Sequence, residues 1–417
     1  MVLAIIIILG TILRAANLEK AAAFNYDQEV AAFWLKNLLV DHKFSLIGQE
    51  ISVGGVYIAP FFYYLMAPFY ALFNLNPLAG NVFVTLVSIF TLIAIYKLGK
   101  QVFSTSVGLF SSFLYAIHPG IIAYDKTVAP SNLIVLLSTA LVLVLTKKAK
   151  GVKEYVFIGM LLGLSFSVHP TAVLLVAISV IFVEKKFLPL IFLIIFIFVS
   201  PLLLFDLRHD WLNIANTLKL FSFSQTGDFV WRFTESIELW LVYWAGIIVS
   251  SDMVFIKYPL MGLAIVIWFK AKSFFKIWTI IPLIFVLFYP RHVPEYYLLI
   301  LTPIVLVYTL GILNKKVRVL ILILGIYFAV KNIDFSDNPT GLYYKIQAVN
   351  SIPKNRPVTV YFSNDLGQNW GFSYLFWRQN VDITADSTQK YLIIIPASRE
   401  PQTRGDLFGA IKVAKIN

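Results

Sequence analysis

The sequence contains no cysteine, and only 13% of its 417 residues are charged. Without cysteine the chain forms no disulfide bond, has no thiolate nucleophile and offers no cysteine ligand to a metal. Soluble domains usually carry about twice that share of charged residues. Hydrophobic residues instead make up 59% of the chain, and they gather in long runs. Such a composition requires a membrane as solvent.

Eleven apolar segments approach the length of roughly 20 residues with which a helix crosses a membrane. The first lacks the basic start and the small-residue cleavage site of a signal peptide, so we expect it to be a transmembrane helix. Two further apolar runs, 56–73 and 239–249, are expected to be interfacial or re-entrant segments. The eleven predicted spans are 2–13, 78–98, 107–122, 133–146, 155–168, 171–183, 187–205, 254–269, 277–289, 297–313 and 319–330.

Basic residues are concentrated in every second connection between these segments. Because cytoplasmic loops of membrane proteins are rich in lysine and arginine, these connections are predicted to face the cytoplasm. The amino terminus is then cytoplasmic, and the long loop 17–76 with its interfacial helices lies outside. The net charge of +12 therefore reports orientation and does not indicate nucleic-acid binding. The basic connections hold Lys97 and Lys100; Lys147, Lys148, Lys150 and Lys153; Lys185 and Lys186; Lys270, Lys272 and Lys276; and Lys315, Lys316 and Arg318.

The composition becomes polar after residue 331. Short β-like runs there surround a predicted helix over 368–379. We therefore predict an all-α transmembrane domain over 1–331 and a small extracytoplasmic α+β domain over 332–417. The β-like runs are 357–362, 391–395 and 410–416.

Two carboxylates, Asp27 and Glu29, follow the first apolar segment. An acidic side chain at a membrane boundary is costly to dehydrate, so such residues tend to lie in water-filled functional cavities. The alternative is that both acids only stabilise the N-terminus of a juxtamembrane helix. We expect Asp27 to be the chemical centre of a polytopic membrane enzyme.

Several short sequence motifs in the outer loops occur in the same order as in one known protein family. In this order the chain resembles the GT-C superfamily of integral-membrane glycosyltransferases, close to the protein O-mannosyltransferase and aminoarabinose-transferase branch of glycosyltransferase family 39. The sequence departs from the family pattern at Gln28, where Glu is usual, at Lys126, where Arg is frequent, and at His169, where Lys is common. The matching residues are Arg14, the run Tyr26-Asp27-Gln28, Pro60, Tyr63, Tyr64, Pro68, Lys126 and the segment 296–303.

The resemblance implies transfer of a sugar from a polyprenyl-phosphate carrier to an acceptor hydroxyl on the outer face, with inversion at the anomeric carbon. The acceptor would be a lipid, a glycan or a protein. Asp27 would take the acceptor proton, with Glu29 as a second catalytic candidate. The leaving lipid phosphate needs cations, for which the candidates are Arg14, Lys126, His169, Arg291 and His292. The residues expected to line the cavity for sugar and lipid are Tyr57, Tyr63, Tyr64, Asp125 and Tyr296.

Other interpretations stay open. Lys126 can be an ordinary snorkelling lysine, and His169 a residue that only ends a helix. A divalent metal ion is a further alternative, because carboxylates and imidazoles share the outer side, although no metal-binding spacing occurs. Two other functions compete, a transporter or flippase for lipid-linked sugars and a non-catalytic scaffold. Transporters place polar groups near the bilayer midplane. Most segments here are free of charge, which favours an enzyme. We expect this enzyme in the plasma (inner) membrane.

Overall fold

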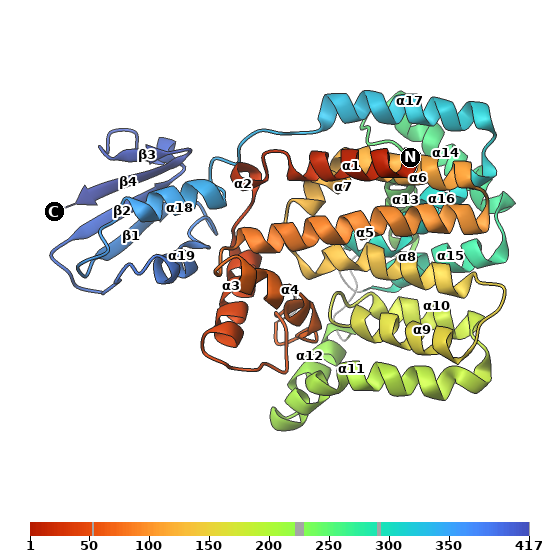
Figure 1. The fold of residues 1–417 in the computed structure, drawn as a ribbon, viewed down its shortest axis with the longest axis horizontal. Coiled ribbons are helices and arrows are strands. Elements are labelled where there is room, and N and C mark those ends of the chain that lie inside the picture. Colours follow the sequence, from red (N-terminus) through yellow and green to blue (C-terminus); the bar gives the residue numbers. More distant parts are fainter. Residues whose placement is uncertain (52–53, 222–228, 290–292, 417) are drawn as a thin grey trace.

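The computed structural model describes residues 1–51, 54–221, 229–289 and 293–416. A bundle of helices forms most of the molecule, and a small sheet with two helices lies beyond one end of the bundle (Figure 1). The helices up to residue 332 are α1 (Val2–Ala15), α2 (Leu18–Ala21), α3 (Tyr26–Leu39), α4 (Phe61–Leu72), α5 (Leu78–Val102), α6 (Thr105–Ile117), α7 (Pro119–Asp125), η1 (Pro130–Leu133), α8 (Ile134–Leu145), α9 (Val152–Ser165), α10 (Ala172–Phe182), η2 (Lys185–Phe187), α11 (Leu188–Arg208), α12 (Leu212–Phe221), α13 (Phe229–Ile248), α14 (Val254–Lys270), α15 (Ser273–Phe288), η3 (Glu295–Leu301), α16 (Thr302–Ile312) and α17 (Lys315–Asn332).

All eleven apolar segments expected to span the membrane are helical, with ends displaced by a few residues. The segment 107–122 is broken at Pro119, where α6 and α7 meet at 62°. By length and composition, three of the described helices can cross a membrane, or four if α6 and α7 form one span. Five more apolar helices are shorter than that limit. The predicted helices are therefore present, while helix length alone supports fewer than eleven spans.

The segment 239–249 differs from its prediction as an interfacial or re-entrant element. It forms the second half of α13, a 20-residue helix that packs against α14, α15 and α16. Two of its buried side chains bond to α16: Trp244 Nε1 donates to Thr309 Oγ1 at 2.9 Å, and the Tyr243 and Thr302 hydroxyls lie 2.7 Å apart. Charged residues interrupt the apolar residues in the first half of α13, so hydropathy alone indicated only the second half of this helix.

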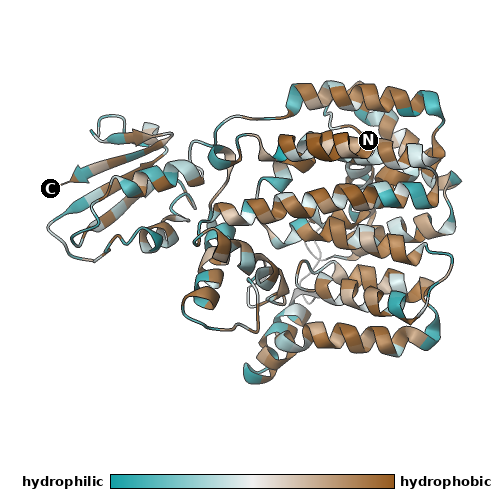
Figure 2. Cartoon of the chain, viewed as in Figure 1, coloured by the Kyte–Doolittle hydropathy of each residue, from teal (hydrophilic) through white to brown (hydrophobic). Residues whose placement is uncertain are grey.

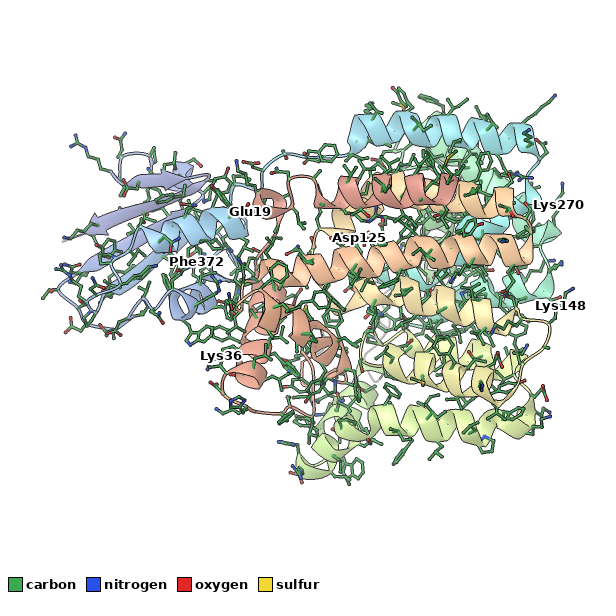
Figure 3. The ribbon with its side chains drawn as sticks, in the orientation of Figure 1. Glu19, Lys36, Asp125, Lys148, Lys270 and Phe372 are labelled. Atoms are coloured by element: carbon green, nitrogen blue, oxygen red, sulfur yellow. The ribbon has the colours of Figure 1, made fainter. Side chains whose placement is uncertain are left out.

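The basic connections gather at one end of the bundle. Lys148 and Lys270 lie at the end opposite the sheet (Figure 3). The helices α2, α3 and α4 lie at the other end, between the bundle and the sheet (Figure 1). The alternation of charge along the chain thus corresponds to two separate ends of the molecule.

Apolar residues cover the outer surface of the bundle as well as its core (Figure 2). In α11, only Ile191, Ile195 and Asp206 are buried, although nearly the whole helix is apolar. A large exposed apolar face marks a surface that contacts a membrane or another protein. The helix contacts α9 through Gly163, where a Cβ atom would lie 2.8 Å from Phe198 Cβ. Small residues of this kind allow close helix packing in membranes.

The sheet beyond the bundle has four strands in the order β1-β2-β4-β3. Strands β1 and β2 are parallel, with Val360 opposite Tyr391, and the other pairs are antiparallel. The three predicted β-like runs correspond to β1, β2 and β4, and the predicted helix is shorter than expected because it begins after Gly371, at φ 93°. The elements are α18 (Leu342–Asn350), β1 (Thr359–Asn364), α19 (Phe372–Arg378), β2 (Lys390–Ile395), η4 (Ala397–Arg399), β3 (Asp406–Phe408) and β4 (Ile411–Ile416).

Candidate active site

Asp27 lies in the first turn of α3, and its neighbours fix the position of that turn. The Asn25 N–H donates to Gln28 Oε1 at 3.0 Å, and Gln28 Nε2 donates to the Val128 carbonyl at 2.8 Å. The Asp27 side chain itself is exposed and makes no hydrogen bond or ion pair within the described part of the chain. Partial desolvation by the surrounding protein raises the pKa of Asp27. The result is an exposed carboxylate without a hydrogen-bond partner among the described residues, on a turn whose backbone is held by its neighbours.

Glu29, unlike Asp27, has a hydrogen-bond partner in the sheet domain. Its side chain is buried, and Oε1 accepts the Tyr374 N–H at the start of α19 at 2.9 Å. Lys345 on α18 lies nearby, and its Nζ donates to the Phe24 carbonyl at 2.7 Å and to the Trp370 carbonyl at 2.6 Å. These contacts fasten the sheet domain to the segment that carries Asp27. The catalytic role of Glu29 stays a prediction.

The aromatic residues of the first outer loop pack tightly around Trp34. The Tyr63 ring stacks on Trp34 at 4.9 Å, and the Tyr64 ring meets the same indole edge-on at 5.0 Å. The Tyr63 hydroxyl donates to Gln49 Oε1 at 2.7 Å and the Tyr64 hydroxyl to the Ser45 carbonyl at 3.0 Å. Their hydroxyls are therefore engaged within the protein.

Tyr57 lies apart from this group. Its N–H donates to Asn213 Oδ1 at 2.8 Å, and its ring contacts Phe205 at 5.5 Å. Its position ties the first outer loop to the end of α11 and the start of α12.

Two predicted site residues, Arg14 and Asp125, bind each other. Arg14 Nε donates to Asp125 Oδ2 at 2.8 Å and to Ser88 Oγ at 2.6 Å. The other guanidinium nitrogens donate to the carbonyls of Gly10, Tyr115 and Ala116. Arg14 is fully buried. Each nitrogen of its guanidinium thus has a partner inside the protein, and its phosphate contact stays a prediction.

The other two candidate cations that the structure describes, Lys126 and His169, are both buried. Lys126 Nζ donates to the Asp334 carbonyl at 2.9 Å, and desolvation lowers its pKa. Burial lowers the pKa of His169 to about 4, so the imidazole is neutral at pH 7. Its Nδ1 lies 2.9 Å from Thr171 Oγ1. Arg291 and His292 lie outside the described residues.

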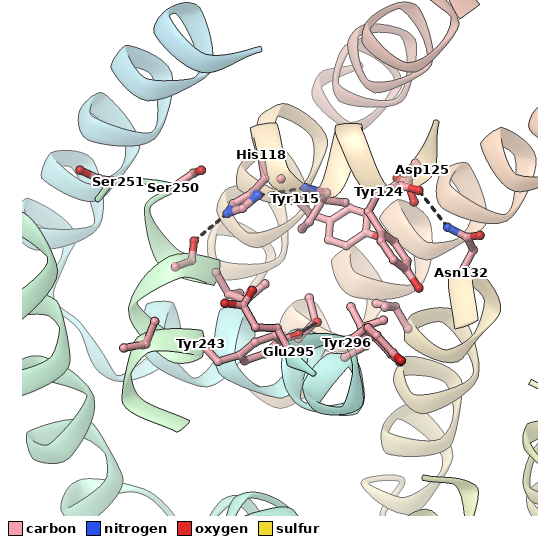
Figure 4. Close-up of a pocket in the computed structure, with 18 of the residues that line it drawn as sticks. Tyr115, His118, Tyr124, Asp125, Asn132, Tyr243, Ser250, Ser251, Glu295 and Tyr296 are labelled. Carbon is pink, nitrogen blue, oxygen red and sulfur yellow. Dashed lines mark hydrogen bonds between the residues drawn. The ribbon is translucent and has the colours of Figure 1, made fainter. Parts of the chain in front are cut away.

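A cavity of about 440 Å³ lies between α6, α7, α13 and η3 (Figure 4). Asp125 and Tyr296, both predicted for the substrate cavity, line it, whereas Asp27 does not. Sequence reasoning did not assign several of its polar residues to a site. Among these, Glu295 begins η3 and Tyr124 lies next to the last residue of α7. A position beside a helix end is a signal that the sequence contains. The other unassigned polar residues include Tyr115, His118, Asn132 and Tyr243.

His118 closes one side of this cavity as a structural residue. Its Nε2 lies 2.7 Å from the Gly246 carbonyl, and its Nδ1 accepts the Ile121 N–H at 3.2 Å. With Nδ1 accepting, the proton is assigned to Nε2. The imidazole therefore caps α7 and joins it to α13. No group of three or more His, Asp or Glu side chains suited to a metal ion occurs in the parts of the chain that the structure describes.

Residues 58–205 match the family described as dolichyl-phosphate-mannose-protein mannosyltransferase. No curated protein matches the chain at a significant level. The structure resembles ArnT from Cupriavidus metallidurans bound to undecaprenyl phosphate, with 10% identity, a TM-score of 0.64 and coverage of 99% of this chain and 97% of that one. The apo form of that ArnT gives a TM-score of 0.62 at the same identity and coverage.

The Archaeoglobus fulgidus oligosaccharyltransferase, in complex with Zn and sulfate, is also similar in structure. It is 13% identical, with a TM-score of 0.55, and the match covers 92% of this chain and 62% of the longer enzyme. The resemblance inferred from the outer loops is thereby confirmed. The chain has the GT-C fold seen in ArnT, and its segment 58–205 matches the model of the dolichyl-phosphate-mannose-protein mannosyltransferase family.

Proposed function

We propose that the protein transfers a sugar from a polyprenyl-phosphate donor to an acceptor hydroxyl, with Asp27 as general base. The Asp27 carboxylate takes the hydroxyl proton, and the hydroxyl oxygen forms a bond to the anomeric carbon. The bond between that carbon and the phosphate oxygen breaks, and polyprenyl phosphate leaves with the bonding electrons. Attack from the face opposite the leaving group inverts the anomeric centre, which becomes oxocarbenium-like on the way.

One observation supports this proposal most strongly: of the two acids predicted to act, only Asp27 has an exposed, unbonded carboxylate. Glu29 is buried and accepts the Tyr374 N–H. A general base must reach the proton it removes, and its pKa should lie closer to the working pH than that of an ordinary aspartate. The raised pKa of Asp27 moves it in that direction.

Lys126 is the proposed ligand of the donor phosphate. Its ammonium uses one of three donors on the Asp334 carbonyl, which leaves two for phosphate oxygens. Gln28, next to Asp27, binds the Val128 carbonyl, so the loop after Lys126 and the first turn of α3 are held together. Arg291 and His292 are further proposed cations. Neutral His169 would contribute a hydrogen bond and no charge.

The donor class rests on the ArnT likeness, because that enzyme was observed with undecaprenyl phosphate. The cavity lined by Asp125 and Tyr296 is the proposed entrance for one of the two substrates. By the positive-inside rule, the lysine-rich end faces the cytoplasm. The sheet domain and Asp27 then lie on the outer face of the plasma membrane, and the acceptor is a lipid, a glycan or a protein.

The test uses purified protein in lipid nanodiscs with a panel of polyprenyl-phosphate sugars and acceptor mixtures. Release of free polyprenyl phosphate is followed for the parent, Asp27→Asn and Glu19→Gln. Glu19 is an exposed acid on α2 and serves as the matched control. We expect turnover by the parent and the control, and a loss of at least a hundredfold in Asp27→Asn.

Equal turnover in Asp27→Asn would exclude Asp27 as the base and move the assignment to Glu29. In sealed proteoliposomes of the same protein, movement of the lipid-linked sugar across the membrane without release of polyprenyl phosphate would favour a transporter. The protein could also bind the donor but neither release polyprenyl phosphate nor move the lipid-linked sugar, with every acceptor class present. That outcome would contradict the enzyme proposal and favour a scaffold.

A further inference from the structure

A second cavity lies far from Asp27, at the lysine-rich end of the bundle. It is an open groove of about 800 Å³ between α5, α8 and α9. Apolar side chains form its walls, with the exposed rings of Phe90 and Phe157 at its rim. Ala94 and Ala140 line it with the smallest side chains, which leaves the groove wide. Helices α5 and α8 run side by side along its length (Figure 1).

One end of the groove is basic. Lys97, Lys100 and Lys147 line it there, and all three are exposed. Lys147 pairs with Glu154 at 3.1 Å, whereas Lys97 and Lys100 have no acidic partner among the described residues. Gln101 Nε2 donates to the Leu143 carbonyl and to Thr146 Oγ1, both at 2.8 Å, and so joins α5 to α8 beside the lysines.

The length of the groove fits one leaflet of a bilayer. The α5 side chains that line it run from Phe90 to Gln101, along one face of the helix. From Phe90 to Lys100, ten residues at 1.5 Å each, the groove extends about 15 Å. The hydrocarbon core of a bilayer is about 30 Å thick, so one leaflet accounts for about 15 Å. With the lysines at the headgroup level, the apolar walls therefore extend to about the bilayer centre.

We propose that this groove binds an acidic phospholipid of the leaflet at the lysine-rich end. An acyl chain lies along the apolar walls, and the headgroup phosphate contacts Lys97 and Lys100. Two unpaired cations above an apolar groove complement a ligand with one anionic head and long apolar tails. Basic residues at a membrane surface attract acidic lipids. The site does not depend on the proposed sugar transfer, because it lies at the opposite end of the bundle.

Native mass spectrometry of the purified protein tests the proposal. The protein is released from detergent containing equal amounts of phosphatidylglycerol and phosphatidylcholine, and the retained lipids are counted. Lys97→Gln/Lys100→Gln removes the charge, and Ala140→Phe fills the groove without changing charge. Lys316→Gln, an exposed lysine on α17 at the same end, is the control. A thermal melt checks that each variant is folded.

We expect the parent and the control to retain phosphatidylglycerol in preference to phosphatidylcholine. The double lysine variant should lose on the order of tenfold in phosphatidylglycerol retention, while phosphatidylcholine retention stays the same. Ala140→Phe should lower the retention of both lipids. Unchanged retention in the lysine and alanine variants would overturn the proposal. Displacement of phosphatidylglycerol by an equal amount of polyprenyl phosphate would overturn it as well, because the occupant would then be the donor lipid.

Discussion

Arg14 and Asp125, 111 residues apart, form an ion pair in which Nε and Oδ2 lie 2.8 Å apart and both side chains are buried. The pair joins α1 to the end of α7, directly before Lys126. Ser88 Oγ lies 2.6 Å from both Arg14 Nε and Asp125 Oδ2 and so ties α5 into the same cluster. Three helices are thus held together next to the candidate phosphate ligand.

Replacing Asp125 should destabilise the fold strongly. Asp125→Asn leaves the Arg14 charge buried without compensation, and breaking such a pair from one side typically costs about 3–5 kcal/mol. The thermal midpoint in detergent should fall by many degrees relative to the parent. Asp386→Asn, an exposed acid in the sheet domain, should melt like the parent. Equal midpoints for both variants would show that the pair is not charged as described.

Lys345 should couple the sheet domain to the Asp27 segment in a pH-dependent manner. Desolvation lowers the pKa of Lys345 from 10.5 to about 8. Between these values the unfolded chain binds more protons than the folded one, so stability rises with pH. Lys345→Met leaves the Phe24 and Trp370 carbonyls without their donor. The melting temperature of the parent should therefore exceed that of the variant by more at pH 9.5 than at pH 7. A constant difference would contradict the assigned pKa.

His169 should make the protein sensitive to acid. Its pKa of about 4 lies below the ordinary value of 6.5 because the imidazole is buried. Between pH 6.5 and 4 the unfolded chain takes up a proton that the folded chain does not, so stability falls as the pH falls. At pH 5 this contribution amounts to up to about 2 kcal/mol. Thermal melts at pH 7 and 5 should show a smaller loss in His169→Gln than in the parent. Identical losses of stability in the parent and the variant would assign the titration to a group other than His169.

Gly163 should not tolerate a large side chain. A Cβ atom there would lie 2.8–2.9 Å from three Phe198 side-chain atoms, at the contact of α9 with α11. Gly163→Leu should cost about 1–3 kcal/mol through overpacking, measured by thermal melting. Gly262 on α14 has no atom within 4 Å of its Cβ position, so Gly262→Leu is the matched control and should be nearly neutral. A larger loss in the control would contradict the described helix packing.

The helices were predictable from the sequence because the lipid environment requires long apolar runs. All eleven runs are helical, and the lysine-rich connections between them gather at one end. The extent of α13 was not predicted, because Arg232, Glu235 and Glu238 interrupt its apolar residues, although most of its second half is buried in the bundle. Strand β3, with three residues, is too short to give a pattern.

The candidate site was predictable only in part. The position of Asp27 at the start of a juxtamembrane helix follows from local sequence. The partners of Arg14 and Glu29 do not, because Asp125 and Tyr374 are brought to them by the fold from 111 and 345 residues away. Nor does any local pattern indicate the neutral state of His169, which results from burial among residues of other helices.

The most direct test of the proposed function is the single-turnover rate of Asp27→Asn with the donor identified from the panel. The proposal predicts a rate lowered by a factor of about 10² to 10⁴, as for loss of a general base, with donor affinity and melting temperature like those of Glu19→Gln. A rate within twofold of the parent, in a folded variant that binds the donor, would contradict the assignment of Asp27 as the catalytic base.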